Sequence, residues 1–238
     1  MMEWSEEAIL LSARRHGEAG AVATLFARGK GVHAGMVPGG ASRAMRGVLQ
    51  PGNLVLATWR ARLSEQLGSF HLDPLRDVAG ALLSDAARLS ALSSACALVE
   101  AALPEREAHP ALWDATRALL DALPSESWAT VYVHWELALL RELGFGLDLS
   151  ACAATGVTEE LCWVSPKSGR AVSRQAGEPW RTKLLPLPAF LLAGGEGRAE
   201  DLLAGLALTG YFLDRHVMAA HGLSLPAARS RLVDRLRP

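Results

Sequence analysis

Cysteine and long apolar runs are scarce in this sequence of 238 residues. The three cysteines, Cys96, Cys152 and Cys162, form no CxxC pair, so we expect reduced thiols and not a disulfide framework. The longest apolar stretches are interrupted by prolines or charges and are too short for a membrane-spanning helix. The acidic N-terminus lacks the basic start and cleavage site of a signal peptide, which indicates a protein of the cytoplasm.

Motifs for covalent chemistry are also missing. The glycine-rich segment 194–198 lacks the GxxxxGK[ST] pattern of a phosphate-binding loop, and no serine stands in GxSxG or SxxK. The seven histidines show neither HExxH nor another tight metal spacing. We therefore expect no enzyme activity, no cofactor and no metal; a hydrolase that uses scattered histidines and carboxylates is the competing class.

Half of the residues are hydrophobic and 21% are charged, which is typical of a compact globular protein. The net charge of −1 hides an uneven distribution. Between residues 81 and 147, nine acidic residues face four basic ones. Between residues 14 and 62, one acidic residue, Glu18, stands against eight basic ones: Arg14, Arg15, Arg28, Lys30, Arg43, Arg46, Arg60 and Arg62.

This basic region is a candidate nucleic-acid surface, because a local cluster of cations attracts phosphates even on a neutral chain. The alternative is that the arginines are solvated side chains around a small sheet. Charge alone does not decide between the two.

The first 74 residues read as five short strands separated by glycine-rich turns. The predicted strands are 8–12, 21–27, 31–37, 54–59 and 67–72. Five strands in so short a segment favour a small barrel of the OB type, which can bind oligonucleotides on one face. We therefore predict an α+β protein with an OB-fold domain at residues 1–74.

Residues 75–238 are predicted to form a mainly helical domain. Apolar residues recur at helical spacing from Leu75 to Leu92, from Leu112 to Leu123 and from Trp128 to Leu143, with Ser125 as a possible N-cap and Gly144 as a stop. A small hairpin-like insertion is expected at about 148–180, where glycine and proline are frequent. Helical pattern returns over 200–221 and 226–236.

Several phrases of the sequence together carry a family resemblance. They are Arg14-Arg15-His16-Gly17-Glu18, Gly39-Gly40-Ala41-Ser42-Arg43, Leu49-Gln50-Pro51-Gly52, Glu142-Leu143-Gly144-Phe145-Gly146-Leu147-Asp148-Leu149, Cys152-Ala153-Ala154-Thr155-Gly156, Trp163-Val164-Ser165-Pro166-Lys167-Ser168-Gly169-Arg170 and Leu185-Pro186-Leu187-Pro188. Their order and spacing resemble the RecO family of DNA repair proteins, particularly its alphaproteobacterial branch.

The resemblance implies an OB domain joined to a helical domain with an embedded zinc-finger-like element. It also implies a nucleoid-associated protein of the RecFOR pathway that binds single- and double-stranded DNA and anneals complementary strands. Such a protein works with RecR and RecF to load RecA onto DNA covered by single-strand-binding protein.

One departure concerns zinc. Some members of the family bind zinc through two CxxC pairs, and the corresponding positions here read Cys152-Ala153-Ala154-Thr155 and Ser173-Arg174-Gln175-Ala176. One of four ligands remains, and Cys162 adds at most a second, whereas structural zinc needs four nitrogen or sulfur ligands. We therefore expect that the inserted element folds without metal.

The eight basic residues of the barrel are our candidate phosphate contacts. Lys167, Arg170 and Arg174 could extend the DNA track, or they could belong to a solvated turn. The family also implies capture of the C-terminal tail of single-strand-binding protein by the helical domain, for which Arg117 and Arg141 are candidates unless they form ion pairs with Asp121 or Glu142. The alternative function is a helical protein-interaction adaptor without significant DNA binding.

Overall fold

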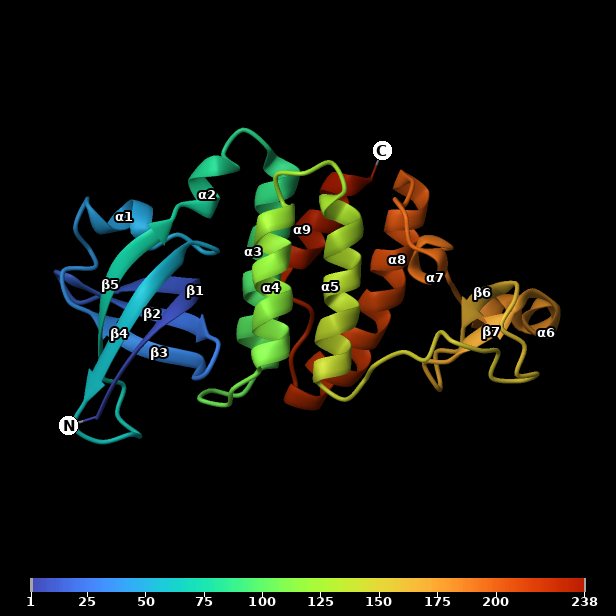
Figure 1. The fold of residues 1–238 in the computed structure, drawn as a ribbon, viewed down its shortest axis with the longest axis horizontal. Coiled ribbons are helices and arrows are strands. Elements are labelled where there is room, and N and C mark those ends of the chain that lie inside the picture. The colour runs from blue at the N-terminus through green and yellow to red at the C-terminus, as the bar shows by residue number, and fades with distance from the viewer. Residues whose placement is uncertain (1, 238) are drawn as a thin grey trace. The chain divides into compact units, whose positions relative to one another are not determined.

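The N-terminal sheet closes into a five-stranded barrel (Figure 1). The structure is a computed structural model that describes residues 2–237. The strands, in the barrel order β1-β2-β3-β5-β4, are β1 (Met2–His16), β2 (Gly20–Ala27), β3 (Gly31–Val37), β5 (Ser69–Arg76) and β4 (Leu54–Ala61). All neighbours are antiparallel except β3 and β5. This is the predicted OB arrangement, and the five predicted strands are confirmed.

Strand β1 is much longer than the segment 8–12 that the sequence pattern indicates. Its first half pairs with β4, from Met2 opposite Ala61 to Ile9 opposite Leu54. Its second half pairs with β2 as far as His16 opposite Gly20, after an irregularity between Leu10 and Ser12. Only the middle of the strand is buried continuously, because each end has a partner on one side alone. The polar ends therefore gave no strand signal.

Aromatic side chains fill one part of the barrel interior. Trp59 and Phe70 are each 2% exposed, and Trp4 packs against them. These strand aromatics therefore belong to the core. His33 lies in the same cluster, with its ring centroid 4.7 Å from that of Trp59 and 5.3 Å from that of Trp4. Neither ring nitrogen of His33 has a hydrogen-bond partner among the described residues.

The pKa of His33 is lowered to about 4, first because burial disfavours the charged imidazolium and then because Arg106 and Lys30 add positive charge nearby. An unfolded histidine protonates at about pH 6.5, so the unfolded chain binds more protons than the folded chain between these values. We therefore expect the titration of His33 to leave the free energy of unfolding unchanged above about pH 6.5. As the pH falls toward 4, it should lower the free energy of unfolding by about 3 kcal/mol.

A His33→Phe variant should therefore lose less stability on acidification than the parent protein. Urea unfolding of both proteins at about pH 7 and about pH 5 would measure the difference in the free energy of unfolding. Equal losses in the two proteins would show that His33 is not the source of the acid sensitivity.

The helical pattern that was predicted to run unbroken from Leu75 is divided in the structure. Strand β5 continues to Arg76, and α2 (Val78–Ala81) is a single turn whose Asp77 cap accepts a hydrogen bond from Gly80 N. Helix α3 (Ala86–Ala102) starts anew at Asp85, whose carboxylate accepts hydrogen bonds from Ala87 N and Arg88 N at 3.0 Å. The prediction of one continuous helix was wrong because two aspartate caps start separate helices.

The later helices agree with the sequence pattern in place. They are α4 (Pro110–Ala122), α5 (Trp128–Glu142), the run of α8 (Ala199–Phe212), η2 (Leu213–Met218) and η3 (Ala219–His221), and α9 (Ala227–Leu236). Two single-turn helices, α1 (Met45–Val48) and α7 (Phe190–Ala193), were not predicted. The N-cap of α5 is Ser127, without a side-chain capping bond, so the assignment of Ser125 was wrong. Gly144 follows the helix end with φ +83°, as its predicted role as a stop requires.

A small three-stranded sheet begins within the segment where the hairpin-like insertion was predicted and ends beyond it. Its strands, in the order β7-β6-β8, are β7 (Ala171–Ser173), β6 (Leu161–Val164) and β8 (Leu185–Pro186). Two short helical segments, α6 (Arg174–Gly177) and η1 (Glu178–Lys183), connect β7 to β8.

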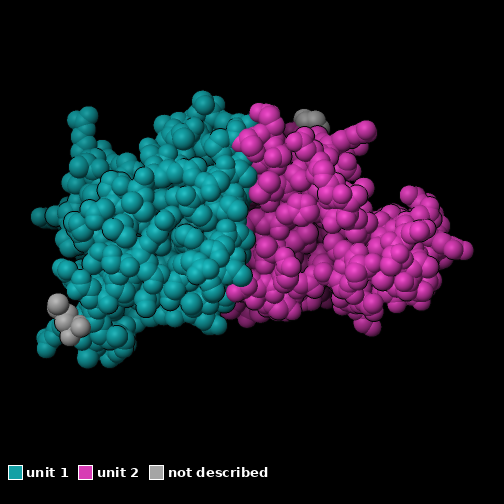
Figure 2. All heavy atoms as spheres, viewed as in Figure 1, with its two compact units in different colours: residues 1–124, 226–232 teal, residues 125–225, 233–238 magenta. Residues whose placement is uncertain are grey.

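The described chain divides into two compact units (Figure 2). The first runs to Pro124 and includes Pro226–Leu232, so the barrel, α3 and α4 belong together. The second contains α5, the small sheet and α8. Within residues 2–237, none of the helices combines the length and the apolar character needed to cross a membrane.

Candidate nucleic-acid interface

Two loops meet at one end of the barrel and carry four arginines. Arg14 and Arg15 lead into the β1–β2 turn, and Arg43 and Arg46 lie in the connection that contains α1. A hydrogen bond of 3.1 Å from Ala41 N to Ala19 O joins the two loops. All four arginines are exposed, and none forms an ion pair with another described residue. We call these four residues the basic end of the barrel.

Gly40 permits this close approach of the two loops. A Cβ atom at this position would lie 2.7 Å from Ala21 Cβ and 2.9 Å from Val37 O. A larger residue would therefore push the connection away from β2. The glycine that the sequence pattern marked as a turn thus positions two of the four arginines.

The other four basic residues of the barrel lie away from the basic end. Arg28 and Lys30 are in the β2–β3 turn, which an antiparallel meander places opposite the β1–β2 turn. Arg60 and Arg62 are at the end of β4, beside the start of β1. Arg60 donates to Glu3 at 2.8 Å and Arg28 pairs with Asp114, whereas Lys30 and Arg62 have no ion pair with the described residues. Six of the eight candidates are therefore open to an external phosphate.

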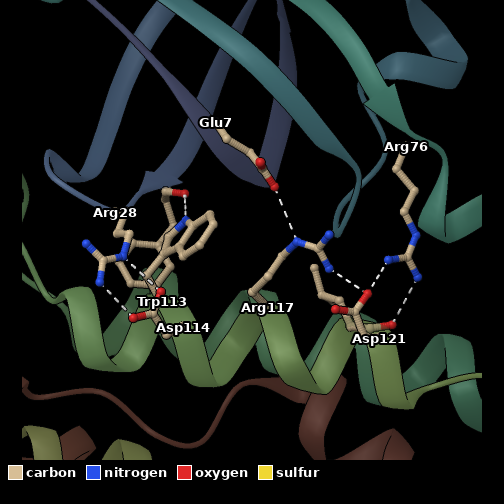
Figure 3. A network of polar contacts seen from close by, with 9 residues as sticks. Glu7, Arg28, Arg76, Trp113, Asp114, Arg117 and Asp121 are labelled. Carbon is tan, nitrogen blue, oxygen red and sulfur yellow. Dashed lines mark hydrogen bonds and ion pairs between the residues drawn. The ribbon is translucent and has the colours of Figure 1, made fainter.

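Helix α4 is fixed to the barrel by a polar network (Figure 3). Arg28 donates two hydrogen bonds of 2.9 Å to the Asp114 carboxylate, and the buried Trp113 donates from Nε1 to Phe26 O at 3.0 Å. Arg117 donates to Glu7 at 3.2 Å and to Asp121 at 2.5 Å.

Asp121 also accepts from Arg76, a residue at the end of β5. Although burial raises the pKa of Asp121, hydrogen bonds from Arg117 and Arg76 hold it below its usual value. Arg117 is thus already bound at this contact, as the ion-pair alternative predicted. Arg141 lies exposed at the end of α5 in the second compact unit, without an ion pair to the described residues.

We predict that Trp113 matters more for stability than the Arg28–Asp114 pair. Trp113→Phe removes a hydrogen bond to a buried carbonyl, which should lower the free energy of unfolding by about 1 kcal/mol or more. Asp114→Asn weakens an ion pair whose side chains are 57% and 52% exposed, so its cost should stay below about 1 kcal/mol. Urea unfolding of both variants provides the measurement, and the opposite ranking would contradict this account of the contact.

The three basic residues of the inserted element have different surroundings. Lys167 and Arg174 are exposed and unpaired with the described carboxylates, and Arg170 pairs with Asp148 at 3.2 Å. Gly169, with φ +68°, donates to Ser165 O at 2.9 Å and closes a tight turn around Lys167. The turn exists, and the participation of these cations in DNA binding stays a prediction.

Two of the positions where the family resemblance implies zinc ligands, Cys152 and Ser173, are joined by a hydrogen bond. Cys152 is 1% exposed, and its Sγ accepts a hydrogen bond from Ser173 N at 3.3 Å. Burial alone would raise its pKa, but hydrogen bonds from Ser173, Thr155 and two backbone amides lower it to about 6. Among residues 2–237, no group of three or more histidine, cysteine or carboxylate side chains could hold a metal. These residues do not fit the four-ligand zinc site of the family.

The strand order and the connections of the barrel define an OB-fold protein. Two family models match the chain: Recombination protein O N terminal over residues 1–75 and Recombination protein O C terminal over residues 83–224. A DNA repair protein RecO of Rhodospirillum centenum is 60% identical over 238 residues, covering 99% of this chain and 95% of that protein. DNA repair protein RecO of Rhodospirillum rubrum is 52% identical, covering 100% and 97%. The chain belongs to the RecO family, and its role lies in DNA repair and recombination.

Proposed function

We propose that this protein is a recombination mediator whose barrel binds DNA phosphates without covalent chemistry. The observation that carries the proposal is the basic end of the barrel, where four exposed and unpaired arginines converge on an OB fold. Arginines at such positions bind phosphates by releasing condensed counterions, which gives affinity for single- and double-stranded DNA with little sequence preference. Lys30, Arg62, Lys167, Arg170 and Arg174 would extend this contact.

In this proposal the protein anneals complementary strands and helps to load RecA onto DNA covered by single-strand-binding protein. RecR and RecF act with it, and the complex works in the cytoplasm at the nucleoid. Annealing needs two strands held at once by phosphate contacts, which leaves their base edges free to pair. No nucleotide, metal or other cofactor takes part.

The double substitution Arg43→Ala, Arg46→Ala should weaken binding of labelled single-stranded DNA and flatten its salt dependence. Loss of two phosphate contacts lowers the slope of log affinity against log salt by about 1.4. Arg28→Ala, Arg60→Ala is the matched control, because it removes the same charge from two arginines that already have carboxylate partners. The control should lower the slope much less.

Titrations at two salt concentrations distinguish the two candidate functions. If the basic-end variant binds as the parent protein does, the DNA site lies elsewhere. If the parent protein has no salt-sensitive DNA affinity, the chain functions as a protein-interaction adaptor.

We further propose that the second compact unit binds the C-terminal tail of single-strand-binding protein, which ends in acidic residues and an apolar tip. Of the two candidate arginines, Arg141 forms no ion pair with the described residues and can meet such a carboxylate, whereas Arg117 is engaged with Glu7 and Asp121.

Arg141→Glu should weaken binding of a tail peptide by the full chain several-fold without changing the melting temperature. Arg117→Glu should instead lower the melting temperature, because the new carboxylate would lie beside those of Glu7 and Asp121 and repel both. Fluorescence anisotropy and thermal unfolding separate these effects. Unchanged peptide affinity in Arg141→Glu would exclude this arginine from the tail site.

A further inference from the structure

The second compact unit contains a cleft of about 190 Å³, and of its lining residues only Lys167 has a role in the function proposed above. Its walls are the loop 144–147 after α5, the turn 167–169 between β6 and β7, and the side chains of Phe212 and His216. Pockets for whole drug-sized ligands measure roughly 300–1,000 Å³. The cleft therefore suits one ring-sized group of a larger ligand.

Three aromatic rings lead from the core of this unit to the cleft. The ring centroids of Phe212 and His216 are 5.8 Å apart with an interplanar angle of 14°. Those of His216 and Phe145 are 5.4 Å apart at 28°. Phe212 is 3% exposed, whereas Phe145 is 39% exposed. Phe145 thus offers an aromatic surface to solvent, supported by a stacked histidine.

The backbone around the rings has two unusual features. His216 belongs to the π-helical segment η2. The π-helix is a rare conformation, and where it occurs it frequently lies at a functional site. Gly169 has φ +68°, and a Cβ atom there would lie 3.2 Å from Leu147 Cδ2 and 3.7 Å from Phe212 Cε1. A side chain at this position would be strained and would crowd the cleft.

Lys167 supplies positive charge at the wall of the cleft. It is exposed and has no ion pair with the described residues, while its neighbour Arg170 is held by Asp148. A ligand that joins a flat ring to an anionic group would satisfy both the aromatic surface and this ammonium group. Of the partners that a DNA repair protein meets, an unpaired nucleotide has this combination.

We propose that this cleft binds an unpaired base of single-stranded DNA, stacked on Phe145, with the adjoining phosphate at Lys167. The site extends the DNA contact beyond the barrel, and it rests on the proposed DNA-binding function. Stacking on an aromatic ring is tolerant of sequence because every base has a π-face. The cleft would hold one base out of the strand, while the barrel binds the backbone.

Titration of the full chain with labelled oligo(dT) tests the stacking. Phe145→Leu should weaken binding by about fivefold to tenfold, and Phe145→Trp should restore it. An abasic strand of the same length keeps the phosphates but has no bases, so Phe145→Leu should bind it as the parent protein does. Equal affinity of parent and Phe145→Leu for oligo(dT), or equal losses on both strands, would overturn the proposal.

Lys167→Gln tests the phosphate contact. It should weaken binding of oligo(dT) and of the abasic strand alike. Arg181→Gln is its control, because Arg181 already pairs with Glu178 at 3.3 Å and loss of its charge should change affinity less. An equal effect of the two substitutions would remove Lys167 from the site.

Photo-crosslinking of the parent protein to an oligonucleotide with 5-iododeoxyuridine gives a readout that needs no variant. Crosslinks at Phe145 or His216 support the proposal. Crosslinks confined to the barrel overturn it and leave the proposed DNA binding intact, whereas a parent protein that binds no oligonucleotide overturns both. If no DNA crosslinks form at Phe145 and an acidic peptide with an apolar tip covers this residue instead, the cleft belongs to a protein partner and the proposal is overturned.

Discussion

Strand β1 closes the barrel by pairing with β4 along its first half and with β2 along its second half. This double pairing requires a strand of 15 residues and a change of register near Leu10. It also fixes the position of the β1–β2 turn at the end of the longest strand, next to the connection that follows β3. The four arginines of the basic end converge because the sheet is closed in this register.

Two groups of arginines in the first compact unit differ in their partners, one at the basic end of the barrel and one at the contact with α4. The four arginines of the basic end form no ion pair with the described residues, whereas Arg28, Arg76 and Arg117 form ion pairs at the contact between the barrel and α4. The acidic region of the sequence supplies Asp114 and Asp121 to this contact. A nearly neutral chain can thus keep a local basic surface, because some of its carboxylates, those of Asp114 and Asp121 on α4, pair with other arginines.

Local patterns predicted the elements that depend on local chemistry. Alternating runs between glycine turns identified all five strands, and helical spacing identified α4 and α5. The pattern failed between Leu75 and Leu92, where apolar spacing continued across two aspartate caps. The first end of β1 was missed because its partner strand, β4, is about fifty residues away in sequence. The second end pairs with the adjacent β2, but its exposed polar residues do not alternate with apolar ones.

The candidate site was predictable as a set of cations, but not as a geometry. The charge pattern selected eight basic residues, and no sequence feature distinguished Arg43, which is unpaired, from Arg28, which binds Asp114. The ring stack of Phe145 and His216 joins residues 71 positions apart through a π-helical turn, so neither periodicity nor a motif could reveal it.

A closed barrel also has consequences for how copies of this chain meet. An open sheet exposes unpaired backbone groups along its outer strands, and another chain can add a strand there. Within the described residues the barrel is closed, with β3 and β5 joined where Met36 lies opposite Ser69, and the outer strands of the small sheet, β7 and β8, are three and two residues long. Copies of this chain that meet at high local concentration therefore offer little backbone for templated aggregation, and their mutual contacts are left to side chains.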